Sequence, residues 1–479
     1  MKFTFKTIFF FILFINFAFA QKILTLQDAL SIAMDKSYAV KSAELNLLSS
    51  QKNLEAAKLG LMTSINMQFN IPSYSRTLSS QFNPLTGTQQ FFDYGYTTYD
   101  GSLNFVQPII FTNGTFTLTG DIWKRSQFSS GQQIPNDYYS NLSLSLQQPL
   151  FTFNSLKASL TRAEISLEKA QRNYTSASKD IIYNVTAGFY QLYKAKKNVE
   201  IAEEKVQQTE SSYNTAQNKF KAGLIAEVES LQLEIDLASS RNDLLSAKRT
   251  LEESKNDFKI LIGLKLSDSI DVVAQLDYKP VDVNLDAAID YALSNRNELK
   301  NAEADIDLSK LSVDEINSQG NISAMLSANY GINKDENRLQ DIFHDFDGSR
   351  SVTFTVSVPV LDWGKNKRQV ESAEANLNLY KLSFENQKQE IRKEIIEVVD
   401  NLNSAKARVE TLSKSVELAQ KSYDISLARF QAGTITSFDL QQMQLRLTDA
   451  KTNSLNALID YKLALADLDR KTLHDFEKN

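Results

Sequence analysis

Residues 212–223 read SYNTAQNKFKAG, and residues 422–433 read SYDISLARFQAG. The similarity extends back from these endings, without a gap, to Pro149 and Pro359, at a constant offset of 210 residues. Of the 75 aligned positions, 17 are identical. A shared helix-forming composition would repeat Ala, Leu and Glu, but it would not repeat a proline and a glycine at both ends. The chain is therefore a tandem duplication whose two halves supply the same parts.

A second match lies upstream of each copy, at a larger offset. LQDALSIA at residues 26–33 resembles LDAAIDYA at residues 285–292. The offsets differ because the first half carries a longer insertion between its matched parts. The two matches predict a first structural repeat over residues 21–262, an equatorial linker over 263–284 and a second repeat over 285–479.

The tandem repeat carries a helical pattern. Apolar or small residues recur with alternating spacings of four and three, as at Ile391, Ile395, Val398 and Leu402. A sustained period of about 3.5 residues predicts helices that supercoil around one another. At ~1.5 Å rise per residue, a helix over 155–221 would be roughly 100 Å long. Each half is predicted to contain one long helix packed against two shorter, stacked helices: 155–221 with 227–262 and 26–59, and 365–431 with 437–470 and 285–318.

Between the helices, apolar residues alternate with uncharged polar residues. Runs of roughly 9–11 residues suit a tilted strand that crosses a bilayer with its apolar face outward. A soluble sandwich with one wet face would show the same alternation. The segments are 65–71, 142–146, 322–330 and 352–360.

An additional hairpin, residues 102–107 and 115–123, exists only in the first half. It ends in QPIIFTN at residues 107–113, which echoes QPLFTFN at residues 148–154. Residues 333–350 carry Asp, Glu, Asn, Arg and Gly, and residues 75–100 are similar but rich in Tyr and Phe; both segments are predicted to be exposed loops.

The N-terminus has the features of a secretory signal. Lys2 and Lys6 precede a short apolar run over residues 8–19, and Ala18 and Ala20 fit a small-x-small cleavage pattern. The predicted signal is residues 1–20; a retained anchor is the alternative, but the run is too short to span a bilayer as a helix. No later segment is long and apolar enough either, so membrane insertion would require strands. Loss of the two lysines changes the formal net charge from −6 to −8, which disfavours nucleic acid as a partner.

The sequence predicts no catalytic, cofactor-binding or metal site, and hence no enzyme. There is no Cys, and the two histidines, His344 and His474, lie far apart in the chain. Asp341, Asp345 and Asp347 flank His344 and could hold a cation weakly, but a solvated loop is the simpler interpretation.

Two helical hairpins, two strand pairs, a tandem duplication and paired Phe-x-Ala-Gly turns together resemble the TolC-like outer-membrane efflux protein family. The resemblance covers essentially all of the mature chain. It implies an α+β membrane protein in which long coiled-coil hairpins form a periplasmic α-barrel. Amphipathic strands, four per subunit, would form part of a trimeric transmembrane β-barrel. The implied function is the outer-membrane channel of a tripartite efflux or type I secretion system, a passive exit duct for small molecules or proteins.

The resemblance also implies partners and sites. The homotrimer would contact outer-membrane lipid, a periplasmic adaptor and an inner-membrane pump of the RND, ABC or MFS type. The acidic ring at the periplasmic entrance would fall on Glu229 and Asp439, each six residues after a tip glycine; a solvated acid near a helix N-terminus is the alternative. The implied adaptor-docking tips comprise Phe220, Gly223, Leu224, Phe430, Gly433 and Thr434.

The sequence departs from the family at the tips. The best-known member has an arginine two residues after the second tip glycine, and this arginine helps to close the entrance. Here that position is Ile435, with Ile225 as its counterpart in the first half. Closure by helix packing is therefore expected in place of a salt bridge.

Two other classes of protein carry helical hairpins. A periplasmic adaptor would show a single hairpin flanked by glycine-rich β-domains, and a coiled-coil surface stalk would not need strands of membrane length. The duplicated hairpins joined through amphipathic strands favour the channel over both alternatives.

Overall fold

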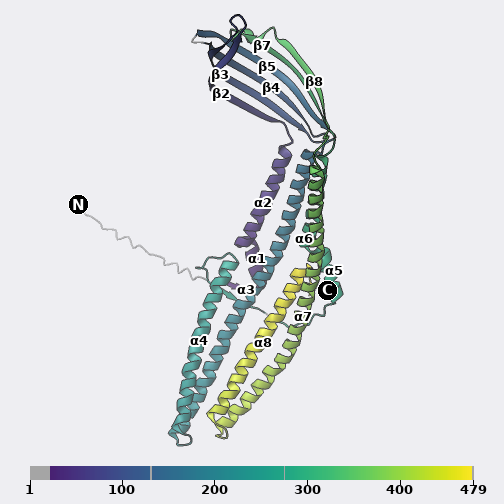
Figure 1. The fold of residues 1–479 in the computed structure, drawn as a ribbon. Helices are drawn as coiled ribbons and strands as arrows, with labels where there is room; N and C mark the ends of the chain where they lie inside the picture. The colour runs from purple at the N-terminus through teal and green to yellow at the C-terminus, as the bar shows by residue number, and fades with distance from the viewer. Residues whose placement is uncertain (1–21, 130–131, 275, 477–479) are drawn as a thin grey trace, which may run out of the picture. The chain divides into compact units, whose positions relative to one another are not determined.

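The computed structural model describes residues 22–129, 132–274 and 276–476 (Figure 1). The expected signal, residues 1–20, lies outside this described part. The chain divides into two compact units, each of which draws on both halves of the duplication. The helical unit comprises Met1–Glu44, Tyr174–Arg296 and Lys388–Asn479, and the sheet unit comprises Leu45–Asn173 and Asn297–Gln387.

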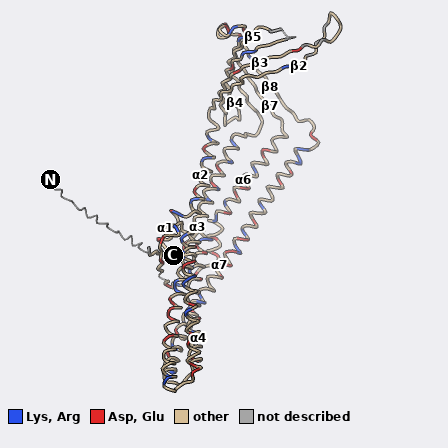
Figure 2. The backbone as a smooth tube through the Cα atoms, turned by 90° about the vertical axis from the view of Figure 1, so that its left-hand side faces the viewer, with Lys and Arg blue, Asp and Glu red and all other residues tan. Residues whose placement is uncertain are grey.

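Two pairs of long helices carry the coiled-coil period in the described residues. α3 (Ser155–Lys221) and α7 (Lys365–Gln431) have 67 residues each. They are followed by α4 (Glu227–Leu261) and α8 (Ser437–Thr472). The second pair begins at the positions that match the first pair in the tandem repeat, which confirms the predicted hairpins. Figure 2 shows charged residues recurring along these helices. No helix among the described residues is both long enough and apolar enough to cross a membrane.

The two predicted upstream helices are each broken in two, which corrects the expectation of single helices over 26–59 and 285–318. The first consists of α1 (Leu26–Lys36) and α2 (Tyr38–Leu59), and the second of α5 (Leu285–Asn295) and α6 (Asn297–Ser318). The residue at each break is extended: Ser37 has ψ 143° and Arg296 has ψ 126°.

Gly263 lies against the chain at the first break. Its φ of +78° ends α4, and a Cβ at this position would overlap the carbonyl group of Lys36. Only glycine therefore allows the chain leaving α4 to pass the end of α1 this closely. On the other side of the break, the Ser37 hydroxyl accepts a hydrogen bond from the Val40 backbone N–H at 3.2 Å and starts α2.

The core of the helical unit gathers around a short parallel ladder. β1 (Lys22–Leu24) pairs with β6 (Ile270–Val272), which lies within the expected linker. The same cluster contains Phe189 of α3 and Phe258 of α4, whose ring centroids are 6.1 Å apart in an edge contact. Because full burial of such a side chain is worth about 1.5–3 kcal/mol, these aromatics contribute strongly to the joining of α3 and α4.

In the described residues, the sheet unit forms one antiparallel sheet of six strands (Figure 1), two more than the four expected per chain. Residues 75–100, expected to be a loop, continue the first two strands as a paired hairpin that closes at Asn83 and Thr88. The ladder uses backbone groups, so a segment in register pairs even without side-chain alternation. In order across the sheet, the strands are β2 (Ser64–Asn83), β3 (Thr88–Ile109), β4 (Gly114–Ser129), β5 (Gln132–Leu150), β7 (Ser323–Glu336) and β8 (Asp347–Ser357).

The second strand pair also differs from its expected limits. β7 and β8 extend into the segment 333–350, so the connection is limited to residues 337–346. Val358 and Val360 lie beyond the end of β8. Pro359 between them has no backbone N–H and cannot continue a ladder.

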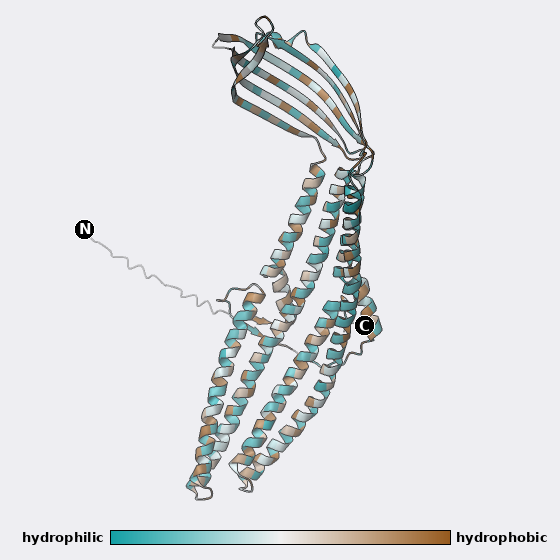
Figure 3. Ribbon diagram, in the orientation of Figure 1, coloured by the Kyte–Doolittle hydropathy of each residue, from teal (hydrophilic) through white to brown (hydrophobic). Residues whose placement is uncertain are grey.

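The register separates the sheet into a polar and an apolar face, and the alternation is visible along the strands in Figure 3. Because directly paired residues lie on the same face of a sheet, the two faces can be followed from strand to strand along rows of paired residues. One row is apolar on five strands, with Ile65, Phe105, Leu118, Leu144 and Tyr330, and ends at Arg350 on β8. The adjacent polar row comprises Asn66, Asn104, Thr119, Ser143, Gly331 and Ser349.

Candidate functional site

The tips of the two helical hairpins are built by the repeated glycines. In the first tip, residues 219–226, Gly223 has φ +73° and the Leu224 N–H donates to the Lys219 carbonyl at 2.9 Å. This left-handed glycine and the bond across it end α3 in the manner of a Schellman motif. The second tip, residues 429–436, repeats the arrangement with Gly433 at φ +76° and a 3.0 Å bond from Thr434 to Arg429.

The matched phenylalanines of the two tips have different environments. Phe220 is 39% exposed, whereas Phe430 is 1% exposed. Phe430 therefore belongs to the interior of the tips and not to their surface, contrary to the expectation for a docking residue. The duplicated sequence does not reveal this difference, because it depends on which helix covers each ring.

Lys219 connects the two tips directly. Its Nζ donates to the Phe430 carbonyl oxygen at 2.5 Å and lies 4.8 Å from the centroid of the Phe430 ring. An ammonium over an aromatic face gains a cation–π attraction in addition to the hydrogen bond. A cation near the end of α7 is also favoured by the helix dipole. One side chain of the first hairpin thus holds the last turn of the second long helix.

Apolar packing surrounds this contact. Ile435 and its counterpart Ile225 pack against the buried tip cluster. The expectation that packing replaces a salt bridge at Ile435 agrees with this arrangement. The cluster comprises Ala216, Leu233, Tyr423, Phe430, Leu440 and Leu447.

Polar contacts between α3 and α8 continue away from the tips. The Gln444 amide donates to the Thr209 hydroxyl at 3.0 Å and to the Lys205 carbonyl at 3.2 Å, and the Gln444 and Thr209 side chains are buried. Further along, Lys451 contacts both carboxylate oxygens of Glu204 at 2.7 Å. Separating the two hairpins would exchange these hydrogen bonds for hydrogen bonds to water, so each contributes about 0.5–1.5 kcal/mol to the contact.

Lys219→Met should loosen the contact between the two tips. The substitution keeps a long apolar stem but removes the charged hydrogen bond, which is worth about 1.5–3 kcal/mol. Such a change shifts an equilibrium between closed and open tips by about 10- to 100-fold. The expected result is a roughly tenfold rise in the open probability of single channels in planar bilayers. Lys221→Met, an exposed lysine two residues on, is the matched control; equal opening of both variants would contradict the role of Lys219.

The two predicted entrance acids are not equivalent. Asp439 is the third residue of α8 and forms a capping box with Thr436, whose hydroxyl donates to the carboxylate at 2.8 Å. These hydrogen bonds from Thr436 lower the pKa of Asp439. Glu229 lies in the first turn of α4, where the N-cap is Ala226 and makes no side-chain bond. Helix capping therefore accounts for Asp439 but not for Glu229.

Sequence reasoning missed Lys219 and Gln444, although each left a signal. A basic residue occurs at the same place in both copies, as Lys219 and Arg429. Gln444 follows Leu440 by four residues and precedes Leu447 by three, so it occupies a core position of the heptad. A polar residue at such a position often fixes the register of a coiled coil.

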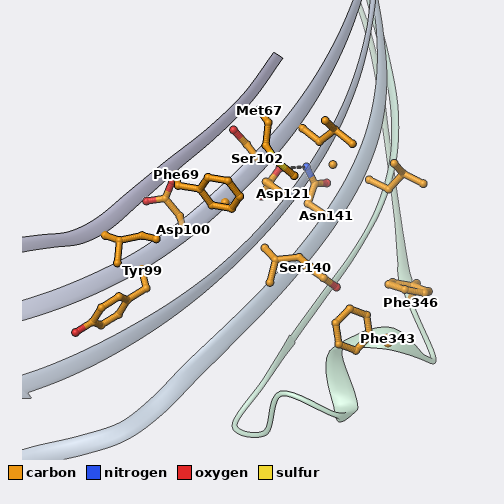
Figure 4. A pocket seen from close by; sticks show the side chains of 16 residues that line it. Met67, Phe69, Tyr99, Asp100, Ser102, Asp121, Ser140, Asn141, Phe343 and Phe346 are labelled. Carbon is orange, nitrogen blue, oxygen red and sulfur yellow. Dashed lines mark hydrogen bonds between the residues drawn. The ribbon is translucent and has the colours of Figure 1, made fainter. Parts of the chain in front are cut away.

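A pocket of ≈ 620 Å³ lies in the sheet unit (Figure 4). It is lined mainly by apolar side chains, including Met67 and Phe69 of β2 and Phe343 and Phe346 of the β7–β8 connection. That connection is held down by Ile342, whose carbonyl accepts from Ser140 at 2.5 Å. The lining also includes polar residues, among them Asp100, Asp121 and Asn141.

Comparison with known proteins agrees with this architecture. A family model described as outer membrane efflux protein matches residues 115–264 and 288–472. Nodulation protein T of Rhizobium leguminosarum bv. trifolii is 21% identical over 365 residues, which cover 74% of each protein. Outer membrane protein TolC of Vibrio cholerae serotype O1 is 22% identical over 320 residues, which cover 65% of this chain and 71% of that protein.

A solved structure of the Campylobacter jejuni CmeC outer membrane channel has the same fold. The two superpose with a TM-score of 0.69 at 15% identity, over 95% of this chain and 88% of that chain. The two blocks matched by the family model together exceed half of the sequence. The chain belongs to the outer membrane efflux protein family.

Proposed function

We propose that three copies of this chain close a passive duct, in which the sheet units span the outer membrane and the helical units line a periplasmic tunnel. As a family member, the chain is an outer-membrane channel component of efflux systems. The observation that carries the proposal is an apolar face that runs across all six strands of a sheet with two open edges.

The open edges require further copies of the chain. β2 and β8 are the outer strands, and each has one row of backbone groups without a partner in the sheet. Unpaired N–H and C=O groups are too costly in hydrocarbon for an open sheet to be stable there. Closure with identical copies satisfies both edges by the same contact, repeated around a symmetry axis.

The exposed tip residues form the docking surface for a periplasmic adaptor, which in turn connects the duct to an inner-membrane pump of the RND, ABC or MFS type. Phe220 and Leu224 of the first tip are 39% and 72% exposed. Thr434 is exposed at the equivalent place in the second tip, beside Gly433. An apolar side chain on a turn that ends a hairpin offers a partner a small anchor rimmed by polar residues.

Glu229 and Asp439, three copies of each, form an acidic ring at the tunnel entrance that favours cations. Glu229→Gln combined with Asp439→Asn should lower the cation-to-anion permeability ratio, measured as the reversal potential in a salt gradient. Because Thr436 lowers the pKa of Asp439, the aspartate contribution should persist as the pH falls below the usual aspartate range. Glu253→Gln, a substitution further along α4, is the control. An unchanged reversal potential in the double variant would remove the ring from the proposal.

The channel itself is tested on the mature protein extracted from membranes. It should fractionate with the outer membrane, migrate as a trimer on gels unless heated, and give single-channel conductance in planar lipid. A monodisperse monomer that stays soluble without detergent would overturn the proposal. A confirmed trimer that never conducts, even with Lys219→Met, would also overturn it.

A further inference from the structure

The first half of the chain contains an insertion with defined ends. Helices α1 to α4 of the first half match helices α5 to α8 of the second half. The insertion lies between α2 and α3. The connection from α2 to α3 runs from Leu59 to Ser155, whereas the connection from α6 to α7 runs only from Ser318 to Lys365. The longer connection holds four strands, and the shorter one holds two.

The extra strands have the form of a duplicated hairpin. The ends of β3 and β5 carry the pairs Gln107-Pro108 and Gln148-Pro149. The Gln107 amide donates to the Leu61 carbonyl at 3.1 Å, and the Gln148 amide donates to the Thr112 carbonyl at 2.7 Å. Each glutamine thus ties the end of its strand to the backbone just before the neighbouring strand. β2–β3 and β4–β5 are consequently two versions of one unit.

The turn between β3 and β4 is built into the start of α3. The Asn154 amide donates to the Ile110 carbonyl at 2.7 Å, and the Asn113 amide donates to the Phe153 carbonyl at 3.3 Å. The Asn113 side-chain oxygen also accepts from the Leu156 N–H at 3.2 Å, one of the free donors of the first helical turn. These hydrogen bonds tie the turn between β3 and β4 to the segment that joins β5 to α3.

Both faces of the sheet continue through β3 and β4. Phe105 and Leu118 extend the apolar row between Ile65 and Leu144. Asn104 and Thr119 extend the adjacent polar row, and Thr119 donates to Asn104 at 2.8 Å. A plug inside a channel or a loop outside a membrane would not need this strict separation. The pattern is that of strands with one face in lipid and one in water.

We propose that each chain supplies all six strands, so that three copies close a barrel of 18 strands with a correspondingly wide lumen. This inference rests on the proposed trimeric channel. Barrel diameter grows roughly linearly with strand number, so the lumen is about half again as wide as that of a 12-stranded barrel. A duct of this width admits bulky, polar cargo such as an unfolded polypeptide at its outer end.

The directions of the edge strands fit this closure. β2 leads away from α2 and β8 leads into α7, so in an up-and-down sheet of six strands the two edges run in opposite directions. The seam between one copy and the next therefore continues the antiparallel ladder. Within β2 the ladder with β3 shifts between Asn70 and Ser73, around Pro72, which has no N–H to donate.

Single cysteines test whether β4 is a wall of the lumen. The sequence contains no cysteine, so each substitution is the only reactive thiol. Thr119→Cys and Leu118→Cys lie on opposite faces of β4, and Ser143→Cys and Leu144→Cys are their cross-strand partners on β5. A charged, water-soluble thiol reagent is applied to reconstituted trimers, and labelling rate and conductance are recorded.

The expected result is labelling at Thr119→Cys and Ser143→Cys that is at least tenfold faster than at their neighbours, with reduced conductance. If both β4 cysteines are labelled fast while the two β5 cysteines still differ, β4 is not part of the barrel wall. That result would overturn the 18-stranded barrel but not the channel proposal. Loss of alternation on both strands would overturn the channel proposal itself.

Excision of the duplicated unit tests the width of the lumen. Deletion of residues 107–147 joins Val106 to Gln148, so that β3 leads through the same Gln-Pro ending into α3 and the sheet has four strands. The probe is polyethylene glycol of graded size, added on the outer side, where exclusion depends on the barrel and not on the tips. The wild-type exclusion radius should be about 1.5-fold that of the variant. Equal exclusion radii for the wild type and the deletion variant would overturn the inference. If the deletion variant does not assemble, the cysteine labelling decides the question by itself.

Discussion

Leu144→Arg is expected to destabilise the assembled channel by about 2–4 kcal/mol per chain, whereas Ser145→Arg is expected to be tolerated. Leu144 lies in the apolar row of β5, opposite Leu118 and Tyr330, and is exposed on the isolated chain. An arginine at this position would have to be buried in hydrocarbon. Ser145, the next residue, has its side chain on the polar face, where an arginine remains hydrated.

The measurement is the midpoint of urea unfolding of trimers in lipid vesicles, together with the temperature at which the trimer band disappears on gels. Because the two positions are neighbours on one strand, any effect of an added arginine on expression or on the strand backbone should be the same in both variants. Similar losses for Leu144→Arg and Ser145→Arg would contradict the assignment of the two faces, whichever number of strands closes the barrel.

Phe189→Ala should lower the free energy of unfolding of the helical unit by about 3–5 kcal/mol. Phe189 is 1% exposed and its ring meets Phe258 edge-on, so truncation leaves a cavity between α3 and α4. The next residue, Tyr190, packs against the Phe189 ring at a centroid distance of 5.7 Å, and this contact is lost as well. A loss of this size is a large fraction of the stability of one unit.

Guanidinium unfolding of the full-length channel in detergent, followed by the helical circular dichroism signal, measures this loss. Ile182→Ala is the control, because Ile182 is on the same helix but is 36% exposed. Its expected effect is below about 1 kcal/mol. If both substitutions cost the same, Phe189 would not be a core residue of the unit.

Local patterns in the sequence determined most of the architecture. The tandem repeat and its coiled-coil period predicted helices over 155–221 and 365–431, which are the bounds of α3 and α7. The tip glycines predicted the turns, because a left-handed residue at a helix end is a local requirement. Alternation likewise predicted strands wherever the two faces differ in polarity.

Only the tertiary structure decided where residues that match in the duplicated sequence have different surroundings. Phe220 and Phe430 are matched in sequence, yet Lys219 of the opposite hairpin covers only the second. The break at Ser37 lies against Gly263, which is distant in the chain. The place of β3 and β4 in the sheet depends on pairing with β2 and β5. A periodic pattern records the face that a segment buries, whereas the identity of the neighbour on that face is settled only when distant segments meet.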